Sequence, residues 1–203
     1  MKIIKTNFKG LLIVKQKNNK DNRGNLREIY SKKILKHDKF PFEYCTTSKK
    51  NSLRGFHFQL GNFQQAKYVN VVKGKILDCV IDLRQKSKTF GKIYKIILSE
   101  KNCLSLYIPE GFGHAYYSYE KLNIVYYKLS NYYKPKLESG LNVLDKGLRF
   151  TNQLILKFLT LIEYKDPNAF KNINLLSSKD ILFLNWLLRD VSSVGINFNI
   201  SPL

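Results

Sequence analysis

A histidine, an arginine and a glutamine stand among apolar residues at 52–59, where the sequence reads Ser-Leu-Arg-Gly-Phe-His-Phe-Gln. His57 is one of only three histidines in the chain. A buried polar group is costly unless it has a hydrogen-bonding partner, so it is often kept for a functional role. Gly55 lets another group approach the backbone closely. Taken alone, the stretch favours an ordinary hydrogen-bonded core histidine in a strand, but the rest of the chain reverses that reading.

Other polar residues add the parts of an acid–base site. A His, a Tyr and a Lys around one cavity can remove a proton next to a ketone, stabilise the enolate and return a proton from the other side. The chain offers His57, Lys67, His114 and tyrosines at 116, 117, 119, 126, 127, 132 and 133. Spacing alone selects none of these tyrosines, because tyrosine is also a favoured strand residue.

A metal centre has weaker support in the sequence. A transition-metal site needs two or three histidines and a carboxylate close together. The strand around His57 reads Phe-His-Phe, and His114 is the one other candidate ligand, since His37 lies in a basic, solvated stretch. No metal is therefore expected.

Composition fits one domain with a packed core, with 203 residues, 44% hydrophobic and 25% charged. No apolar run approaches a membrane span and the N-terminus lacks a signal-peptide core, so we expect a soluble, cytoplasmic protein without a membrane partner. Cys45, Cys79 and Cys103 form no CxxC pair, which fits a reducing compartment. The net charge of +20 is spread along the chain, so nucleic acid is not expected as a partner, although a phosphate-bearing substrate would benefit.

Short strands at regular spacing must position these residues. We predict a strand or hairpin in 1–16 and strands at 68–72, 76–83, 93–98, 104–108 and 122–129, with turns at 21–25, 73–75, 89–91 and 109–111. Residues 31–41 fit a loop or a short helix, and the two strands around Gly74 read as a hairpin. This rhythm indicates a mainly β protein, a sandwich or barrel of the cupin-type jelly-roll class.

The character of the chain changes near residue 145. We predict a jelly-roll domain at 1–150 and a C-terminal extension at 151–203 that packs on the same domain. Residues 153–163 fit a strand or a helix equally well. Ser177-x-x-Asp180 is close to a capping box before an apolar run, which predicts a short C-terminal helix.

Seven ordered segments together carry a family resemblance. They read Leu-Arg-Gly-Phe-His-Phe-Gln at 53–59, Gln-Ala-Lys at 65–67, Val-Lys-Gly-Lys-Ile-Leu-Asp at 72–78, Val-Ile-Asp-Leu-Arg at 80–84, Thr-Phe-Gly at 89–91, Tyr-Ile-Pro-Glu-Gly-Phe-Gly-His-Ala at 107–115 and Tyr-Lys-Leu-Ser-Asn-Tyr-Tyr at 127–133. Over roughly residues 20–145 the chain resembles the dTDP-4-dehydrorhamnose 3,5-epimerase family.

The resemblance implies a jelly-roll homodimer that uses neither cofactor nor metal and epimerises a nucleotide-diphospho-4-keto-6-deoxy sugar. The expected reaction inverts carbons 3 and 5 of dTDP-4-dehydro-6-deoxyglucose, giving dTDP-4-dehydro-L-rhamnose. By its motifs His57 is the base, Tyr127 the acid and Lys67 the group near the keto oxygen. Leu-Ser-Ser-Lys-Asp at 176–180 resembles the element whose aspartate orients the base, which gives that role to Asp180; the alternative is that Asp180 only caps its helix.

The resemblance also implies a set of substrate-binding residues. Arg54 and His114 resemble residues that line the sugar and diphosphate site. Arg23 and Glu28 resemble residues that reach the nucleotide, often across the dimer. Gln59 and Tyr133 stand in matching segments and complete the expected binding residues.

Two departures from the family pattern leave alternatives open. The family usually carries a Gln-x-Asn-x-Ser-like segment before the base, whereas 42–46 here reads Phe-Glu-Tyr-Cys-Thr, and 141–145 lacks the usual tryptophan. One alternative is an epimerase that inverts a single carbon or acts on a GDP- or CDP-linked keto-hexose or heptose. An alternative of another class is a non-catalytic cupin that binds a sugar nucleotide, but a pure binder needs neither His57 nor Tyr127.

Overall fold

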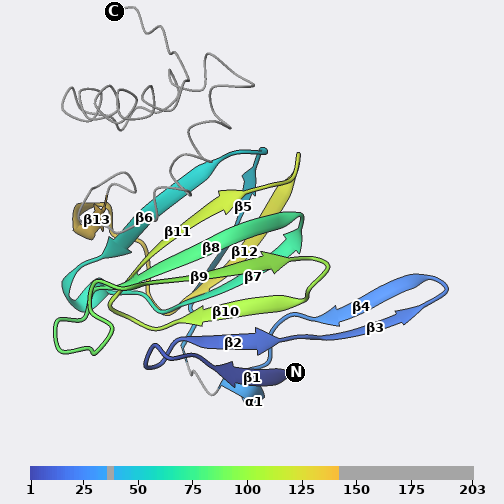
Figure 1. The fold of residues 1–203 in the computed structure, drawn as a ribbon, viewed down its shortest axis with the longest axis horizontal. Coiled ribbons are helices and arrows are strands. Elements are labelled where there is room, and N and C mark those ends of the chain that lie inside the picture. Colours follow the sequence, from blue (N-terminus) through green and yellow to red (C-terminus); the bar gives the residue numbers. More distant parts are fainter. Residues whose placement is uncertain (36–38, 142–203) are drawn as a thin grey trace, which may run out of the picture. The chain divides into compact units, whose positions relative to one another are not determined.

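The computed structural model of the protein describes residues 1–35 and 39–141, and Figure 1 shows their arrangement. Two antiparallel sheets form the body. The larger sheet contains, in spatial order, β1 (Lys2–Lys5), β2 (Leu12–Lys15), β10 (Leu104–Ile108), β7 (Lys67–Lys73), β12 (Asn123–Leu129) and β5 (Phe42–Ser48). The smaller sheet contains β13 (Glu138–Gly140), β6 (Leu53–Gln59), β11 (Phe112–Ser118), β8 (Lys75–Asp82) and β9 (Ile93–Ser99).

A two-stranded arm, β3 (Lys17–Asp21) and β4 (Gly24–Glu28), extends away from these sheets. Helical structure in the described residues is short, comprising α1 (Lys32–Leu35), η1 (Gly61–Phe63) and η2 (Pro135–Leu137). In this part of the chain no helix has the length and hydrophobicity needed to cross a bilayer.

The mainly β, jelly-roll prediction is confirmed. The hairpin in 1–16 forms from β1 and β2, and the predicted strands at 93–98 and 104–108 become β9 and β10. The predicted C-terminal helix, the extension at 151–203, His37 and Asp180 lie outside the described residues.

The predicted hairpin around Gly74 is wrong. β7 pairs with β10 and β12, while β8 pairs with β9 and β11, so the chain passes from one sheet to the other at Gly74. A Cβ at Gly74 would lie 2.5 Å from the carbonyl oxygen of Leu122, and the residue has φ +85°. The glycine therefore allows a close crossover between sheets, a geometry that strand alternation alone cannot distinguish from a hairpin turn.

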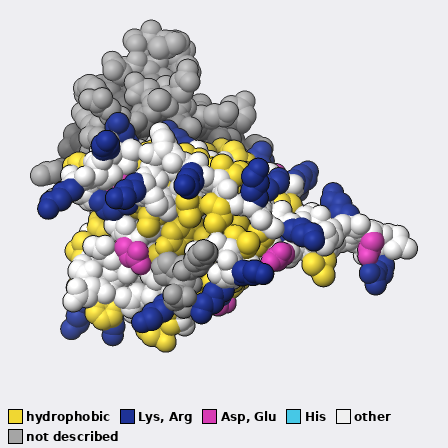
Figure 2. Space-filling view, turned by 90° about the horizontal axis from the view of Figure 1, so that it is seen from below, with side chains coloured by type: hydrophobic (Ala, Val, Ile, Leu, Met, Phe, Trp, Pro, Cys, Tyr) yellow, Lys and Arg dark blue, Asp and Glu magenta, His cyan; other side chains and the backbone are white. Residues whose placement is uncertain are grey.

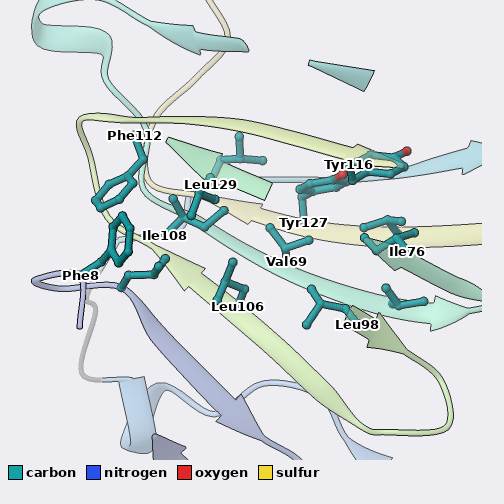
Figure 3. Close-up of a cluster of buried hydrophobic side chains, with 14 residues drawn as sticks. Phe8, Val69, Ile76, Leu98, Leu106, Ile108, Phe112, Tyr116, Tyr127 and Leu129 are labelled. Carbon is teal, nitrogen blue, oxygen red and sulfur yellow. The ribbon is translucent and has the colours of Figure 1, made fainter. Parts of the chain in front are cut away.

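The barrel interior is lined mainly by apolar side chains and also holds buried tyrosines. Phe8 and Phe112 face each other with ring centroids 6.4 Å apart, and aliphatic side chains of β7 and β10 continue the core (Figure 3). Tyr116 and Tyr127 lie together farther along, each buried but carrying a hydroxyl group. Because buried tyrosine hydroxyls need polar partners, the surroundings of these two tyrosines can hold a polar site.

Candidate active site

The close contact of β6 with β11 places His57 beside His114. The two residues are opposite one another in the antiparallel register, and their ring centroids are 6.4 Å apart. Gly55 makes the approach possible, since a Cβ there would lie 2.2 Å from the carbonyl oxygen of His114. The close approach that the sequence predicted for Gly55 is thereby confirmed.

His114 is held by a buried carboxylate. Its Nε2 lies 2.8 Å from Oδ2 of Asp78, and the two side chains are 1% and 0% exposed. His114 Nδ1 and Asp78 Oδ1 have no hydrogen-bond partner among the described residues. Since buried polar atoms are almost always hydrogen-bonded, these two atoms can accept an ordered water or a polar ligand as partner.

Lys67 brings a cation into the same interior. It begins β7 and is 5% exposed. Burial lowers the pKa of its ammonium group to about 8, and the charges of Glu138 and Asp78 oppose that shift. Lys67 is therefore charged at neutral pH, and it is placed to attract a developing negative charge.

Tyr127 is buried on β12 between aromatic neighbours. Its ring stacks on Tyr44 with centroids 4.8 Å apart, and it meets His114 edge-on at 6.0 Å. Burial raises the pKa of Tyr127 well above its ordinary value, and the charges of Tyr116 and Asp78 add to this. The hydroxyl group therefore keeps its proton at neutral pH, as a proton donor must.

His57 itself is held in the neutral state. Burial lowers its pKa below the ordinary value, and the nearby charges of Lys67, His114 and Arg54 lower it further. A neutral imidazole can accept a proton at neutral pH. The side chain keeps 40% of its surface exposed, so the ring is accessible to a ligand.

A second carboxylate approaches His57 from β13. That strand pairs with β6, and Glu138 Oε1 lies 4.0 Å from His57 Nδ1. The hydroxyl group of Tyr133 donates a hydrogen bond to Oε2 of Glu138. Tyr133 thus holds a carboxylate near His57.

Two predicted binding residues are held by hydrogen bonds. Arg54 donates from Nε to Ser48 Oγ at 3.0 Å and from Nη2 to the Thr47 carbonyl at 3.3 Å, which ties it to β5. Gln59 is 5% exposed and donates to the carbonyls of Phe63 and Tyr132. Its oxygen also accepts from the Lys134 backbone, so Gln59 fastens the loops around the site.

Arg23 and Glu28 do not join this group within the described chain. Arg23 lies at the tip of the β3–β4 arm, is 86% exposed and pairs with Asp21 at 2.7 Å. Glu28 ends β4. The arm and β13 lie on opposite sides of the described structure in Figure 1.

Sequence reasoning missed Asp78, Glu138 and Tyr44. Asp78 had a usable signal, because an acidic residue inside an apolar strand needs a buried partner and His114 was one of few candidates. Glu138 follows a Lys-Pro-Lys-Leu loop, and nothing local predicts that it pairs back onto β6.

Among the described residues, no three His, Cys, Asp or Glu side chains lie close enough together to hold a metal ion.

Together, the two sheets and the buried His, Tyr, Lys and Asp side chains define a jelly-roll protein with an acid–base site. A family model described as dTDP-4-dehydrorhamnose 3,5-epimerase matches residues 5–182. The chain belongs to this family of isomerases.

Several known proteins are similar to the chain in sequence and fold. The dTDP-4-dehydrorhamnose 3,5-epimerase of Salmonella typhimurium is 36% identical over 153 residues, which cover 73% of this chain and 84% of the relative. The dTDP-6-deoxy-D-glucose-3,5-epimerase of Legionella pneumophila, solved with dTDP-4-keto-L-rhamnose, is 33% identical with a TM-score of 0.70, covering 74% of this chain and 82% of that one. A 3'-monoepimerase from Streptomyces bikiniensis, solved as a double mutant with dTDP, is 26% identical with a TM-score of 0.68, covering 72% and 76%.

Proposed function

We propose that this protein converts dTDP-4-dehydro-6-deoxyglucose to dTDP-4-dehydro-L-rhamnose by inverting carbons 3 and 5. The observation that carries the proposal is that neutral His57 and protonated Tyr127 both lie beside His114, while the charge of Lys67 acts on His57 from nearby. These are the three protonation states that a proton exchange beside a ketone requires.

The first half of each inversion is removal of a proton. The 4-keto group acidifies the neighbouring C–H bonds, so His57 takes the proton from carbon 3 or carbon 5. The electron pair of that C–H bond forms the carbon–carbon double bond of an enolate, and the negative charge moves to the keto oxygen. The Lys67 ammonium group stabilises this oxyanion, in an interior where burial strengthens electrostatic attraction.

The second half is return of a proton to the opposite face. Tyr127 donates its hydroxyl proton to the same carbon, and the enolate collapses back to the ketone. The His57 imidazolium then loses its proton to solvent and the Tyr127 phenolate regains one. Each inversion therefore places one solvent-derived proton on the sugar.

His114 is a neighbour of both the proposed base, His57, and the proposed acid, Tyr127. Its ring contacts both His57 and Tyr127, and Asp78 fixes which of its nitrogens faces the carboxylate. We propose that His114 contacts the sugar near the keto oxygen. The unpartnered Nδ1 of His114, within the described part of the chain, supports this role.

We also propose that a second copy of the chain completes the nucleotide site. Arg23 and Glu28, which the resemblance assigns to the nucleotide, stand on an arm that points away from β13 (Figure 1). Leu26 on that arm is 69% exposed, which suits contact with a partner. A homodimer would bring one protomer's arm to its partner's site.

The surface and the cysteines support the remaining expectations. Lys and Arg side chains are spread over the face in Figure 2 with hydrophobic side chains between them, and they form no single basic stripe on it. The three cysteines are free, in keeping with a cytoplasmic location.

We also propose that the chain is divided into a domain at 1–150 and a C-terminal extension at 151–203.

Single-carbon epimerisation is the second candidate, and one observation favours it. The segment at 42–46 departs from the family pattern, and the structure places its Tyr44 directly against Tyr127. The 3'-monoepimerase among the similar structures shows that this kind of fold also occurs in a protein so named.

Proton exchange in heavy water tests the proposal. The protein would be incubated with dTDP-4-dehydro-6-deoxyglucose, and the product examined by mass spectrometry and NMR. We expect two deuterons, at carbons 3 and 5, and inversion at both. One deuteron would establish the single-carbon alternative, whereas no exchange with dTDP-, GDP- or CDP-linked keto sugars would contradict the enzyme.

A further inference from the structure

The stretch at 42–46 forms the part of β5 that lies against the proposed acid. β5 and β12 are antiparallel neighbours, and Tyr44 stands directly opposite Tyr127 in the register. Their rings are stacked, with centroids 4.8 Å apart and planes inclined by 29°. The resemblance implies a polar Gln-x-Asn-x-Ser-like segment here, whereas 42–46 reads Phe-Glu-Tyr-Cys-Thr and places an aromatic ring beside Tyr127.

Contacts on several sides restrict the ring of Tyr127. Tyr44 covers one of its faces, and His114 meets it edge-on with an interplanar angle of 69°. Thr46, two residues along β5, is close enough for a hydrogen bond that lowers the pKa of Tyr127. Side chains two apart on a strand share a face, so β5 supplies both the stacking and the hydroxyl contact.

Tyr44 is itself held in place. Its ring packs against Phe42 at 5.6 Å, and Phe42 in turn packs against Tyr132 at 6.2 Å. Burial raises the pKa of Tyr44 to about 12, with the charges of Tyr116 and Glu138 adding to the shift. Tyr44 is therefore a neutral aromatic wall at neutral pH and does not compete with Tyr127 as a second phenolate.

A fixed acid matters because one hydroxyl group must serve two carbons. Carbons 3 and 5 flank the keto group on opposite sides of the sugar ring. The hydroxyl of Tyr127 can reach them equally only if the sugar shifts between the two steps or if the phenol ring moves. Stacking on Tyr44 restricts the movement of the phenol ring of Tyr127. This matters because a misplacement of about 1 Å can change a rate about a hundredfold.

We propose that Tyr44 is a positioning residue that fixes the ring of Tyr127 and thereby sets how reprotonation is divided between carbon 3 and carbon 5. This inference rests on the proposed epimerase function. Tyr44 touches the acid and is not assigned a proton of its own to transfer.

Three variants separate stacking from other contributions of the side chain. Tyr44→Phe keeps the stacked ring and is expected to keep the wild-type ratio of deuterium at the two carbons. Tyr44→Ala frees one face of Tyr127, so we expect kcat to fall about tenfold and the ratio to change at least about threefold, with KM within about twofold. Tyr44→Leu keeps bulk without a planar ring, and it provides a folded test if the alanine variant unfolds.

Tyr126→Ala is the matched control. Tyr126 is also a tyrosine of the same strand pair, but it stands opposite Cys45, and its hydroxyl donates to Glu43 at 2.5 Å, away from the site residues. We expect this variant to keep the wild-type deuterium ratio, whatever it costs in stability. Circular dichroism would confirm that each variant is folded.

The measurement follows deuterium at each carbon by NMR in heavy water, early in the reaction. If Tyr44→Ala and Tyr44→Leu both keep the wild-type ratio and kcat, the positioning role is wrong while the epimerase function stands. If the wild-type protein exchanges no proton with any of the keto sugars, the proposed function fails first and the positioning role fails with it. A changed ratio in Tyr44→Ala and Tyr44→Leu, with both Tyr44→Phe and Tyr126→Ala unchanged, supports the inference.

Discussion

The charge of the buried Lys67 side chain changes close to physiological pH. Burial lowers its pKa to about 8, so the cation that would stabilise the enolate is present below that pH and disappears above it. The unfolded chain holds the same proton up to about pH 10.4. Between these values the unfolded state binds more protons, so stability rises with pH through this window while activity falls.

The first prediction concerns Lys67→Met. We expect kcat/KM to fall about a hundredfold or more, because the oxyanion loses its cation, and the alkaline limb near pH 8 to disappear from the residual rate. Thermal stability at pH 7 should increase, by an amount on the order of 2–3 kcal/mol, because a buried ammonium group is removed. Deuterium uptake as a function of pH and a melting curve measure both effects.

Lys101→Met is the control for this prediction, since Lys101 is an exposed lysine at a turn. It should leave the pH profile and the melting temperature nearly unchanged. An alkaline limb near pH 8 that persists in Lys67→Met would show that another group carries the charge.

Two carboxylates compete for the role of orienting His57. Glu138 is 4.0 Å from the imidazole, beyond hydrogen-bond distance, and both side chains are about 40% exposed, so water screens their attraction. Asp180, the residue that the resemblance assigns to this role, lies outside the described residues. A carboxylate that fixes the tautomer of a catalytic histidine contributes much more than one that acts only through distant charge.

The second prediction follows from that distance. We expect Glu138→Gln to lower kcat only about threefold with KM nearly unchanged, and Asp180→Asn to lower kcat about a hundredfold or more. Steady-state kinetics on both variants, with melting curves alongside, separates catalysis from folding. A larger loss in Glu138→Gln than in Asp180→Asn would transfer the orienting role to Glu138, and a change in stability alone for Asp180→Asn would make it a helix cap.

At the scale of elements, the site depends on how closely β6 approaches β11. Gly55 has φ +97°, and a Cβ there would meet the His114 carbonyl oxygen at 2.2 Å and the Ala115 Cα at 2.8 Å. Both are backbone atoms of the neighbouring strand, so they cannot move without moving β11. His57 and His114 stand on these same strands, and the strand spacing therefore sets the distance between their rings.

The third prediction is that Gly55→Ala damages stability and activity together. Forcing the strands apart at a positive φ should cost about 3 kcal/mol of unfolding free energy and lower kcat at least about tenfold, because His57 moves away from His114. Gly61→Ala is the matched control: Gly61 also has a positive φ, +59°, but a Cβ there would meet nothing within 4 Å. We expect it to cost about 1 kcal/mol and to leave kcat unchanged. Equal losses in the two variants would show that φ, and not the contact with β11, is what matters.

Strand alternation was enough to predict many of the elements but not their partners. The runs at 93–98 and 104–108 are local signals and they became strands. The hairpin at Gly74 failed, because whether a chain folds back beside itself or crosses to a second sheet is decided by contacts that are distant in sequence. β5 was not predicted as a strand, although its Tyr44 and Thr46 turned out to face Tyr127.

The candidate site, like the fold, could be predicted only in part from the sequence. His57, Lys67, His114 and Tyr127 were predicted through motifs, and the structure brings them into one interior. Asp78 could have been suspected as an acidic residue in an apolar strand, although its partner lies 36 residues away. Glu138 could not be assigned from the sequence alone, because it reaches the site through the pairing of a three-residue strand.

At the scale of the whole molecule, the described chain holds the proposed acid–base residues in its barrel and the proposed nucleotide residues on its arm. Arg23 is 86% exposed at the arm's tip, whereas His57 lies on β6, which pairs with β13 on the other side in Figure 1. Exposed hydrophobic side chains between the spread lysines in Figure 2 offer surface for association. A symmetric dimer in which arms are exchanged would reconcile these positions.

The fourth prediction tests that exchange by mixing two inactive variants, Arg23→Ala and His57→Asn. If the arm serves the partner's site, a mixed dimer contains one site with both mutations and one with neither. Random mixing makes half of the dimers mixed, so co-expression should restore about a quarter of the wild-type rate. Deuterium uptake per active-site equivalent is the measurement, and sedimentation velocity confirms that dimers form.

Each alternative arrangement leaves a distinct result in this experiment. If the arm serves its own site, every site in a mixed dimer carries one mutation, and the rate stays at the average of the two parent variants. If the protein is a monomer, mixing likewise restores nothing and sedimentation shows a single species near 23.8 kDa. Restoration can arise only if a site is assembled from two chains, because neither variant contains both Arg23 and His57.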